Sequence, residues 1–230
     1  VLGDCRKNHY RVTPMGRSKA TWLTIDGYLT EQEPGKLPFE KVCIVNVEGF
    51  LDFYPEFIAE EFRKYGVACC FETINFPDLE HIRKNPSEMR SANVARVFDH
   101  EKNLDALADK IRKVVPECDA VIVPAIIGIN RNDSLGLLKS KIDIPLYLLP
   151  TLPPSIPGIK AQQTLQQCFR ALGGEYFLGD TVRSADLENG RVKQVYTVNH
   201  GNIPFEADHF VLATGSFFSE GLVATPDRIV

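Results

Sequence analysis

Residues 42–47 read VCIVNV, and this stretch decides the fold because it holds a single polar residue, Asn46. A nearly continuous apolar run of this length is typical of a strand that is covered on both faces. Further apolar runs occupy residues 67–74, 119–123 and 145–149, and segments with helical spacing separate them. Strands and helices that alternate in this way predict an α/β layer with a parallel sheet.

Caps and apolar spacing predict the helices of this layer. Asp52 is a candidate N-cap of the first helix, and Asp99 is a candidate N-cap of a helix over residues 100–115. Residues 85–88, Asn-Pro-Ser-Glu, resemble a capping box and predict a helix that continues to about residue 98. A short helix is expected before the fourth strand.

The chain before this layer predicts a small β-structure and a linker. Residues 10–24 predict two short strands around the turn Pro14-Met15-Gly16. Residues 26–40 contain Gly or Pro at four positions and show little apolar periodicity, which is typical of a linker.

The chain after residue 155 has a third pattern. A helix is predicted over residues 158–172 because apolar residues recur on one face: Ala161, Leu165, Cys168, Phe169 and Leu172. Asn189-Gly190 between two alternating segments is a strong signal for a β-hairpin, and a β-meander is expected around it. Residues 207–216 are then predicted to form a final apolar strand.

The order of helix, β-meander and strand resembles that of flavoproteins with two dinucleotide-binding domains, in which the final strand returns to the nucleotide-binding sheet. Ala213, Thr214, Gly215 and Ser216 are candidate cofactor-binding residues, since small side chains let a backbone approach a cofactor. The alternative is an ordinary transition from strand to turn. The predicted fold class is α/β: a parallel-sheet middle domain, plus the β-meander and returning strand of a Rossmann-like FAD/NAD(P)-binding flavoprotein domain.

Composition excludes several other classes. The chain has 230 residues, is 44% hydrophobic and has a net charge of −4, which is typical of a globular protein and argues against a nucleic-acid binder. No apolar run approaches the roughly 18 residues of a membrane span. The six cysteines include no Cys-x-x-Cys pair, so buried free thiols are predicted. No metal site is predicted, because the five histidines belong to no ligand cluster.

Four blocks of sequence resemble one family in particular. They are RVTPMGRSKATWL (11–23), NPSEMRSANVARVFD (85–99), LLPTLPPSIPGIKAQQTLQQCFRALGG (148–174) and FVLATGSFFSEGLVA (210–224). Together, and in this order, they resemble the B subunit of the anaerobic glycerol-3-phosphate dehydrogenases, and the resemblance covers essentially the whole chain. The segment LPTLPPSIPGI is far more specific than a generic flavin pattern.

The resemblance implies a function, a cofactor and partners. The family is a flavoprotein subunit, with FMN or FAD, of a bacterial dehydrogenase that has three subunits and oxidises glycerol 3-phosphate to dihydroxyacetone phosphate. Electrons pass toward menaquinone, fumarate or nitrate. The implied partners in this complex are a sister flavoprotein subunit and a membrane-anchoring iron–sulfur subunit. The complex would hold this chain peripherally at the cytoplasmic face of the inner membrane.

One departure from the family pattern concerns the flavin site. A strand followed by Gly-x-Gly-x-x-Gly, which seats the phosphates of a dinucleotide, does not occur in the sequence. We therefore expect an internal fragment of a flavoprotein. Residues 1–40 would supply strands and a linker that join the flavin domain, 41–154 an α/β middle domain (cap or substrate domain), and 155–230 the helix, meander and returning strand of the flavin domain. With an incomplete site, the chain alone is expected to bind flavin weakly or not at all and to be inactive.

Two groups of residues are candidates for contact with the substrate or a partner. Arg90, Asn93 and Arg96 recur at i, i+3 and i+6 of the predicted helix, so two guanidinium groups and an amide would share one side. Arg binds phosphate in a bidentate manner; the alternative is a solvated or ion-paired face. Thr151 and Ser155 precede the helix after the fourth strand, where they would form a wall of the ligand pocket, or Ser155 would be only a helix cap.

No residue is predicted as the catalytic base, since His200 and His209 have the sequence context of turn and strand residues. Two other functions stay open for the chain. One is a non-catalytic module that docks the other subunits of the same complex. The other is a stand-alone α/β domain that binds phosphorylated metabolites.

Overall fold

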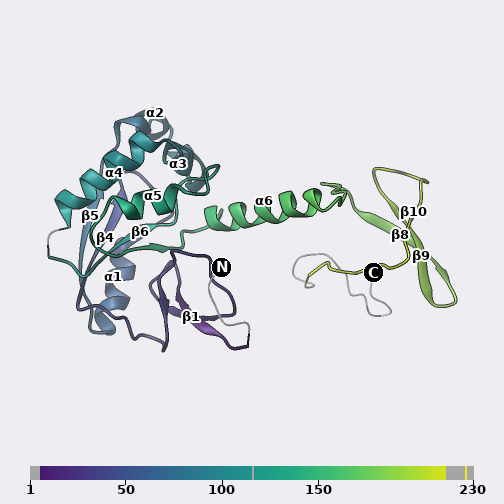
Figure 1. Ribbon diagram of the computed structural model, residues 1–230, viewed down its shortest axis with the longest axis horizontal. Coiled ribbons are helices and arrows are strands. Elements are labelled where there is room, and N and C mark those ends of the chain that lie inside the picture. Colours follow the sequence, from purple (N-terminus) through teal and green to yellow (C-terminus); the bar gives the residue numbers. More distant parts are fainter. Residues whose placement is uncertain (1–5, 116, 216–225, 227–230) are drawn as a thin grey trace. The chain divides into compact units, whose positions relative to one another are not determined.

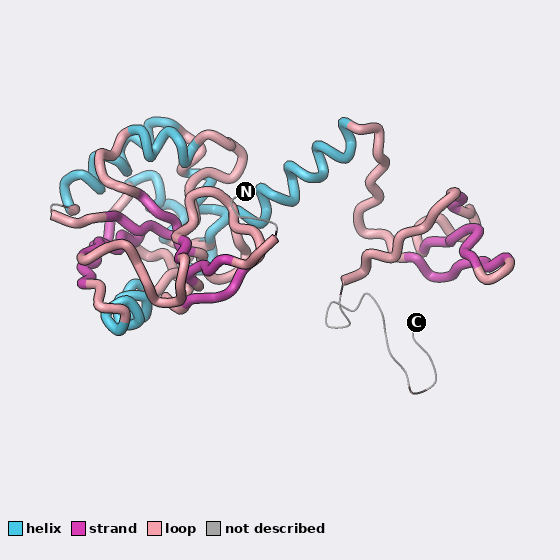
Figure 2. The backbone as a smooth tube through the Cα atoms, turned by 60° about the horizontal axis from the view of Figure 1, so that its bottom comes forward, coloured by secondary structure: helices cyan, strands magenta, loops and turns pink. Residues whose placement is uncertain are grey.

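The computed structural model describes residues 6–115, 117–215 and 226. The chain divides into two compact units, Val1–Ala171 and Leu172–Val230, and each unit is described by itself. Figure 1 labels most of the helices and strands, and Figure 2 shows a loop that follows the last helix before the strands of the second unit begin.

A four-stranded parallel sheet forms the centre of the first unit. Its strands are β4 (Lys41–Val47), β5 (Ala68–Ile74), β6 (Ala120–Pro124) and β7 (Leu146–Leu149), in the order β5-β4-β6-β7. Every residue of β6 is buried, as is expected for a central strand covered on both faces. The predicted parallel α/β layer is therefore confirmed.

Helices cover both faces of this sheet (Figures 1 and 2). Helix α1 (Pro55–Lys64) lies on one side, while α4 (Glu101–Val114) and α5 (Ser134–Ser140) lie on the other. Ile58 and Phe62 of α1 are fully buried and belong to the same apolar cluster as the strands. The segment between β5 and α4 holds four short helices: η1 (Pro77–Leu79), α2 (Glu80–Arg83), η2 (Pro86–Glu88) and α3 (Ser91–Val97).

The N-terminal strands of the first unit form a second, small sheet. Strands β1 (His9–Val12) and β2 (Ser18–Thr21) pair antiparallel, which confirms the hairpin predicted around Pro14-Met15-Gly16. Gly16 has a φ of +80° in this turn, a backbone conformation that glycine adopts at little cost. The segment predicted as a linker contains the two-residue strand β3 (Thr30–Glu31), which pairs with β1.

The second unit contains an antiparallel meander. Its strands are β8 (Val182–Glu188), β9 (Arg191–Thr197) and β10 (Phe205–Glu206), in the order β10-β9-β8. Asn189 and Gly190 have φ values of 54° and 76°, and two positive φ angles are what the tight turn of a two-residue hairpin requires. The predicted hairpin and meander are confirmed.

The strand predicted over residues 207–216 is not observed. Residues 207–215 have no regular secondary structure, and Ser216 lies outside the described residues. Val211 and Leu212 are 87% and 74% exposed. A strand needs hydrogen-bonded neighbours, and no described strand pairs with this segment. Local apolar sequence was therefore insufficient to form a strand here.

Two predicted helix caps are wrong. Tyr54 caps α1 and His100 caps α4, and neither helix has a side-chain cap. The carboxylates expected at these positions bind elsewhere: Asp52 accepts a hydrogen bond from Arg90, and Asp99 accepts backbone N–H groups of residues 129–131. Donors from distant parts of the chain therefore bind these two carboxylates, in place of the N–H groups at the start of the local helix.

The helix predicted from the capping box at 85–98 is interrupted. Residues Pro86–Glu88 form the separate turn η2, and α3 begins at Ser91. Arg90 is the N-cap of α3 and has an extended backbone, with φ of −101° and ψ of 154°. Arg90 is therefore outside the helix on which it was predicted to align with Asn93 and Arg96.

Helix α6 (Ile156–Ala171) begins two residues before its predicted start. Ile156 and Pro157 are buried, but the apolar stripe further along is exposed, with Leu165 at 70% and Phe169 at 47%. Cys168 is also exposed, so the expectation that it is a buried thiol is wrong. Helix α6 therefore carries four of the five residues of the predicted stripe, Leu172 follows its last residue, and much of the stripe is exposed.

Candidate functional site

The carboxyl ends of the parallel strands form the first place to look for a ligand site. Strands β5 and β6 flank β4, so the strand order reverses beside β4. In open α/β sheets, ligands bind outside the carboxyl ends of the strands at such a reversal. The segments that emerge here follow Val47, Pro124 and Leu149, the last residues of three of the strands.

Arg90 and Asp52 form an ion pair at this edge. Arg90 Nη1 donates to Asp52 Oδ1 over 2.7 Å. The side chain of Asp52 is only 2% exposed, whereas that of Arg90 is 52% exposed. Asp52 Oδ2 is buried without a hydrogen-bond partner. Arg90 therefore neutralises an otherwise isolated buried carboxylate, so this arginine has a structural role.

The edge pocket is a cavity of about 530 Å³ beside this ion pair, lined by Asn46, Asp52, Thr73, Arg90 and several apolar side chains. Three of the apolar residues of its lining are exposed: Leu51, Tyr54 and Phe71. The mixture of an arginine with exposed aromatic residues is typical of protein interfaces.

Thr151 and Ser155 have structural contacts in this region. Thr151 is buried, and its hydroxyl lies 3.1 Å from that of Ser91 at the start of α3. Ser155 Oγ accepts the backbone N–H of Gly158 over 3.3 Å, in the first turn of α6. This contact supports the cap interpretation of Ser155.

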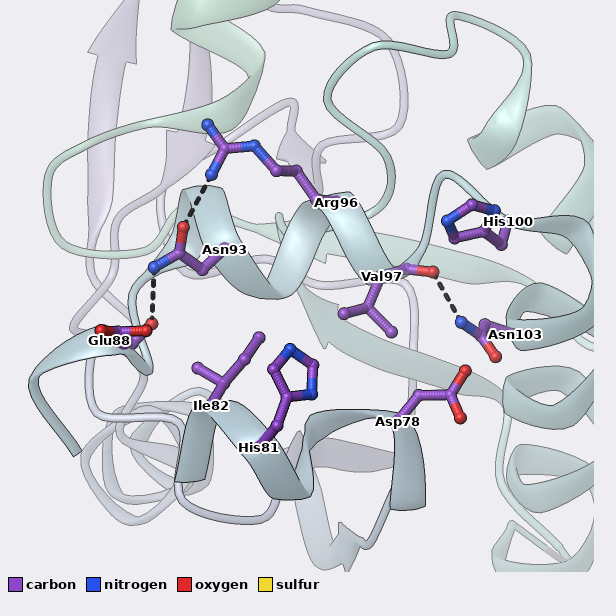
Figure 3. Close-up of a pocket in the computed structure, with 9 residues that line it drawn as sticks. All are labelled: Asp78, His81, Ile82, Glu88, Asn93, Arg96, Val97, His100 and Asn103. Carbon is purple, nitrogen blue, oxygen red and sulfur yellow. Dashed lines mark hydrogen bonds between the residues drawn. The ribbon is translucent and has the colours of Figure 1, made fainter. Parts of the chain in front are cut away.

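A second cavity, the side pocket, contains the other two residues of the predicted group (Figure 3). Arg96 Nη1 donates to Asn93 Oδ1 over 2.7 Å, and Asn93 Nδ2 donates to the backbone oxygen of Glu88 over 2.9 Å. The cavity has a volume of about 540 Å³, and His81 and His100 also line it. The structure thus brings Asn93 and Arg96 together but places Arg90 at a different pocket.

The candidate flavin segment lies in the second unit. Ala213, Thr214 and Gly215 are exposed, and Gly215 has a φ of +82°. Small side chains and a left-handed glycine fit a backbone that a cofactor can approach closely. Ser216 lies outside the described residues, so its place at this segment stays a prediction.

Sequence reasoning missed a polar cluster at the turns of the meander. His200 Nδ1 lies 2.8 Å from Asp180 Oδ2, and the His200 ring meets the rings of Phe177 and Phe205 edge-on. The Thr197 hydroxyl, the Asn199 backbone N–H and His200 all bind the Asp180 carboxylate and hold its pKa well below the usual range. Asp180 had no sequence signal beyond its place directly after Gly179.

This cluster predicts a pH dependence for the second unit. The pKa of Asp180 is lower in the folded state than in the unfolded chain, where it is about 3.9. The stability that the ionised carboxylate contributes is therefore complete above about pH 3.9, and it is lost as the pH falls through the pKa of the folded state. We expect the NMR shift of the Asn199 amide to titrate with an apparent pKa well below 3.9. In Asp180→Asn this titration should disappear, and a midpoint near 3.9 in the unchanged protein would contradict the contact.

The thiols of the sheet form a compact group. Cys70 Sγ lies 3.6 Å from Cys118 Sγ, and Cys43 on the neighbouring strand pairs in register with Cys70. All three are free, as predicted, but only Cys43 is buried, whereas Cys70 and Cys118 are partly exposed. Partial burial raises the pKa of Cys118 to about 11. The described residues include no group of three or more His, Cys, Asp or Glu side chains that could hold a metal ion.

Comparison with protein families defines the class of this protein. Residues 1–230 match the family described as the FAD binding domain. The chain belongs to this family, whose description names a flavin cofactor, and its parallel sheet flanked by helices is consistent with an α/β, Rossmann-like fold. Within the described residues, we find no helix of sufficient length and apolar character to cross a membrane.

Curated relatives share one name. The chain is 40% identical over 229 residues to the B subunit of the anaerobic glycerol-3-phosphate dehydrogenase of Yersinia enterocolitica, and 39% identical over 233 residues to that of Pasteurella multocida. Both alignments cover 100% of this chain and 54% of the relative, so the chain spans about half the length of the curated relatives it matches. No solved structure matches the chain.

Proposed function

We propose that the chain is part of a flavoprotein subunit of an anaerobic glycerol-3-phosphate dehydrogenase. The observation that supports this most is the 40% identity, over the whole chain, to proteins that carry this name. The reaction would oxidise glycerol 3-phosphate to dihydroxyacetone phosphate. The complex would also contain a sister flavoprotein subunit and an iron–sulfur subunit, which would lie at the cytoplasmic face of the inner membrane. These two subunits would pass the electrons to the quinone-linked respiratory chain.

The flavin, FMN or FAD, would supply a ring that accepts a hydride from C2 of the substrate. Ala213, Thr214, Gly215 and Ser216 are proposed to contact it, and the exposed backbone of the first three is consistent with this role. The residues of this chain would also bind or orient the substrate. We further propose that the 230-residue chain by itself is inactive.

Arg96 is the better of the two arginine candidates for the substrate phosphate. No carboxylate of the described residues pairs with Arg96, whereas Arg90 is committed to Asp52. Asn93 holds the Arg96 guanidinium through its amide oxygen and so orients it in the side pocket. A planar guanidinium with unused N–H groups is suited to bidentate binding of a phosphate.

The test uses the longer protein, produced together with its partner subunits. We expect stoichiometric flavin and dye-linked oxidation of glycerol 3-phosphate. Arg96→Ala should raise the KM for glycerol 3-phosphate about tenfold or more without loss of flavin or assembly, because a charge-assisted contact to phosphate is removed. Glu117→Ala, on an exposed loop, is the control. Absence of flavin, or of this oxidation, would contradict the proposal.

The exposed apolar ring of the edge pocket favours a second candidate function, docking of another subunit. Leu51, Tyr54 and Phe71 line the pocket, and the ring of exposed Phe57 lies 6.0 Å from that of Tyr54. In the same reconstitution, Phe71→Glu would abolish assembly if this candidate holds. Normal assembly of Phe71→Glu, together with the expected effect of Arg96→Ala, would contradict the docking function and support substrate binding only.

A further inference from the structure

A third hollow of the first unit is larger than both pockets described above. It has a volume of about 910 Å³, within the range of small-molecule sites, and apolar residues dominate its wall. Ala125 and Ile127, which directly follow β6, and Leu148 of β7 form its inner side. Helices α5 and α6 supply most of the remaining lining, including Gly136 and Lys160. Outside these helices the wall also holds Ile25, Asn132 and two carboxylates, Asp26 and Asp133, the second of which is paired with Arg131. We call this hollow the Lys160 pocket.

Lys160 is an unusual group for such a wall. Its side chain is half-buried, and burial lowers its pKa. The ammonium group donates one hydrogen bond, to the backbone oxygen of Arg131 over 3.1 Å. Asp99 and Asp133 act on it at longer range, and no carboxylate of the described residues lies within 4.0 Å.

The ammonium group therefore has unsatisfied capacity. A lysine has three N–H donors, and the described contacts use one of them. A partly desolvated charge without a close partner is unfavourable, and an anion placed beside it gains more than it would in water. The apolar wall would at the same time accept an aromatic or aliphatic body. The hollow also opens at the carboxyl ends of β6 and β7, where ligands of open α/β sheets bind.

We propose that the Lys160 pocket binds a small organic anion that has an apolar ring system, with its acidic group paired to Lys160. The proposal does not rest on the proposed dehydrogenase function, because it follows from the wall of the hollow alone. Ligands that are small and polar throughout, such as glycerol 3-phosphate, lack the apolar body and are excluded as occupants.

The test uses the full 230-residue chain and two fluorescent probes of similar shape. One is 8-anilinonaphthalene-1-sulfonate, which is an anion, and the other is N-phenyl-1-naphthylamine, which is neutral. We expect the anionic probe to bind once per chain. Lys160→Gln should weaken its binding at least about tenfold, as loss of a desolvated charge pair does, and should change that of the neutral probe less than twofold. Lys160→Arg should restore most of the affinity.

Three controls make the result specific. Lys36→Gln, an exposed lysine outside the hollow, should change neither Kd. Phe169→Ser removes probe binding along the exposed stripe of α6 and should leave the Lys160-dependent site intact. Glycerol 3-phosphate should not displace the anionic probe.

A second variant tests the hollow itself without weakening the fold. A side chain at Gly136 would meet open space, and a larger residue raises helix propensity in α5. Gly136→Phe should therefore fold normally and lose both probes. Unchanged binding of the anionic probe in Lys160→Gln or in Gly136→Phe would overturn the proposal. So would an equal loss of both probes in Lys160→Gln, because Lys160 would then shape the wall rather than bind an anion.

Discussion

Asp99→Ala is expected to lower the free energy of unfolding of the first unit by about 3–4 kcal/mol. The Asp99 carboxylate accepts the backbone N–H groups of Ile129, Asn130 and Arg131 at 2.8, 3.0 and 3.2 Å, and the Asn130 side-chain amide at 2.8 Å. Hydrogen bonds to a charged acceptor are the stronger ones, and removal of the acceptor leaves several donors without a partner at once. Urea denaturation, followed by the fluorescence of the single Trp22, would measure the loss.

Two variants control this result. Asp133→Ala removes an exposed carboxylate that, among the described residues, pairs with nearby Arg131, so a loss below about 1 kcal/mol is expected. Asp99→Asn keeps the shape but places an amide N–H₂ against backbone donors, so it should lose nearly as much as Asp99→Ala. If Asp99→Ala were as stable as Asp133→Ala, the loop after β6 would be held by other contacts.

Arg90→Ala is expected to have the second largest effect, a loss of about 2–3 kcal/mol in the free energy of unfolding. Truncation of Arg90 leaves Asp52, which is 2% exposed, without its only described partner. The value is at the lower end for a buried ion pair because half of the arginine side chain faces solvent. The measurement is again the urea midpoint at constant slope.

The matched comparison is Arg96→Ala, which removes an exposed arginine from α3, the helix that follows Arg90, and should cost less than about 0.5 kcal/mol. Asp52→Asn combined with Arg90→Ala should be more stable than Arg90→Ala alone, because the isolated charge is then absent. An additive double variant would show that the two side chains do not depend on one another. In an assay of the complex, loss of activity in Arg90→Ala must therefore be separated from loss of fold.

The sheet and the hairpins were predictable because their signals are local. The apolar run at 42–47 and the Asn189-Gly190 turn each specify a backbone without help from distant residues. The caps were not predictable in the same way, because the carboxylates of Asp52 and Asp99 can accept hydrogen bonds either from the local helix end or from distant donors. Nothing in a single sequence shows that Arg90 or the amides of 129–131 will be near.

The site was only partly predictable for related reasons. The expected alignment of Arg90 with Arg96 assumed one continuous helix. Helix α3 begins only at Ser91, so Arg90 has an extended backbone and the two side chains line different pockets. The segment at 207–215 has the composition of a strand but no described partner to pair with. Lys160 has no motif at all, because its environment is built from β6, β7, α5 and α6 together.

The exposure of β8 has a consequence for how the chain loses its structure. All seven residues of this strand are exposed, whereas all five residues of β6 are buried. A small antiparallel sheet with so little buried apolar surface is only marginally stable by itself. Local opening would therefore begin in the meander, at a free energy far below that of the parallel sheet. Limited proteolysis would cut the second unit first and leave the first unit intact, as a hierarchy of cooperative folding units requires.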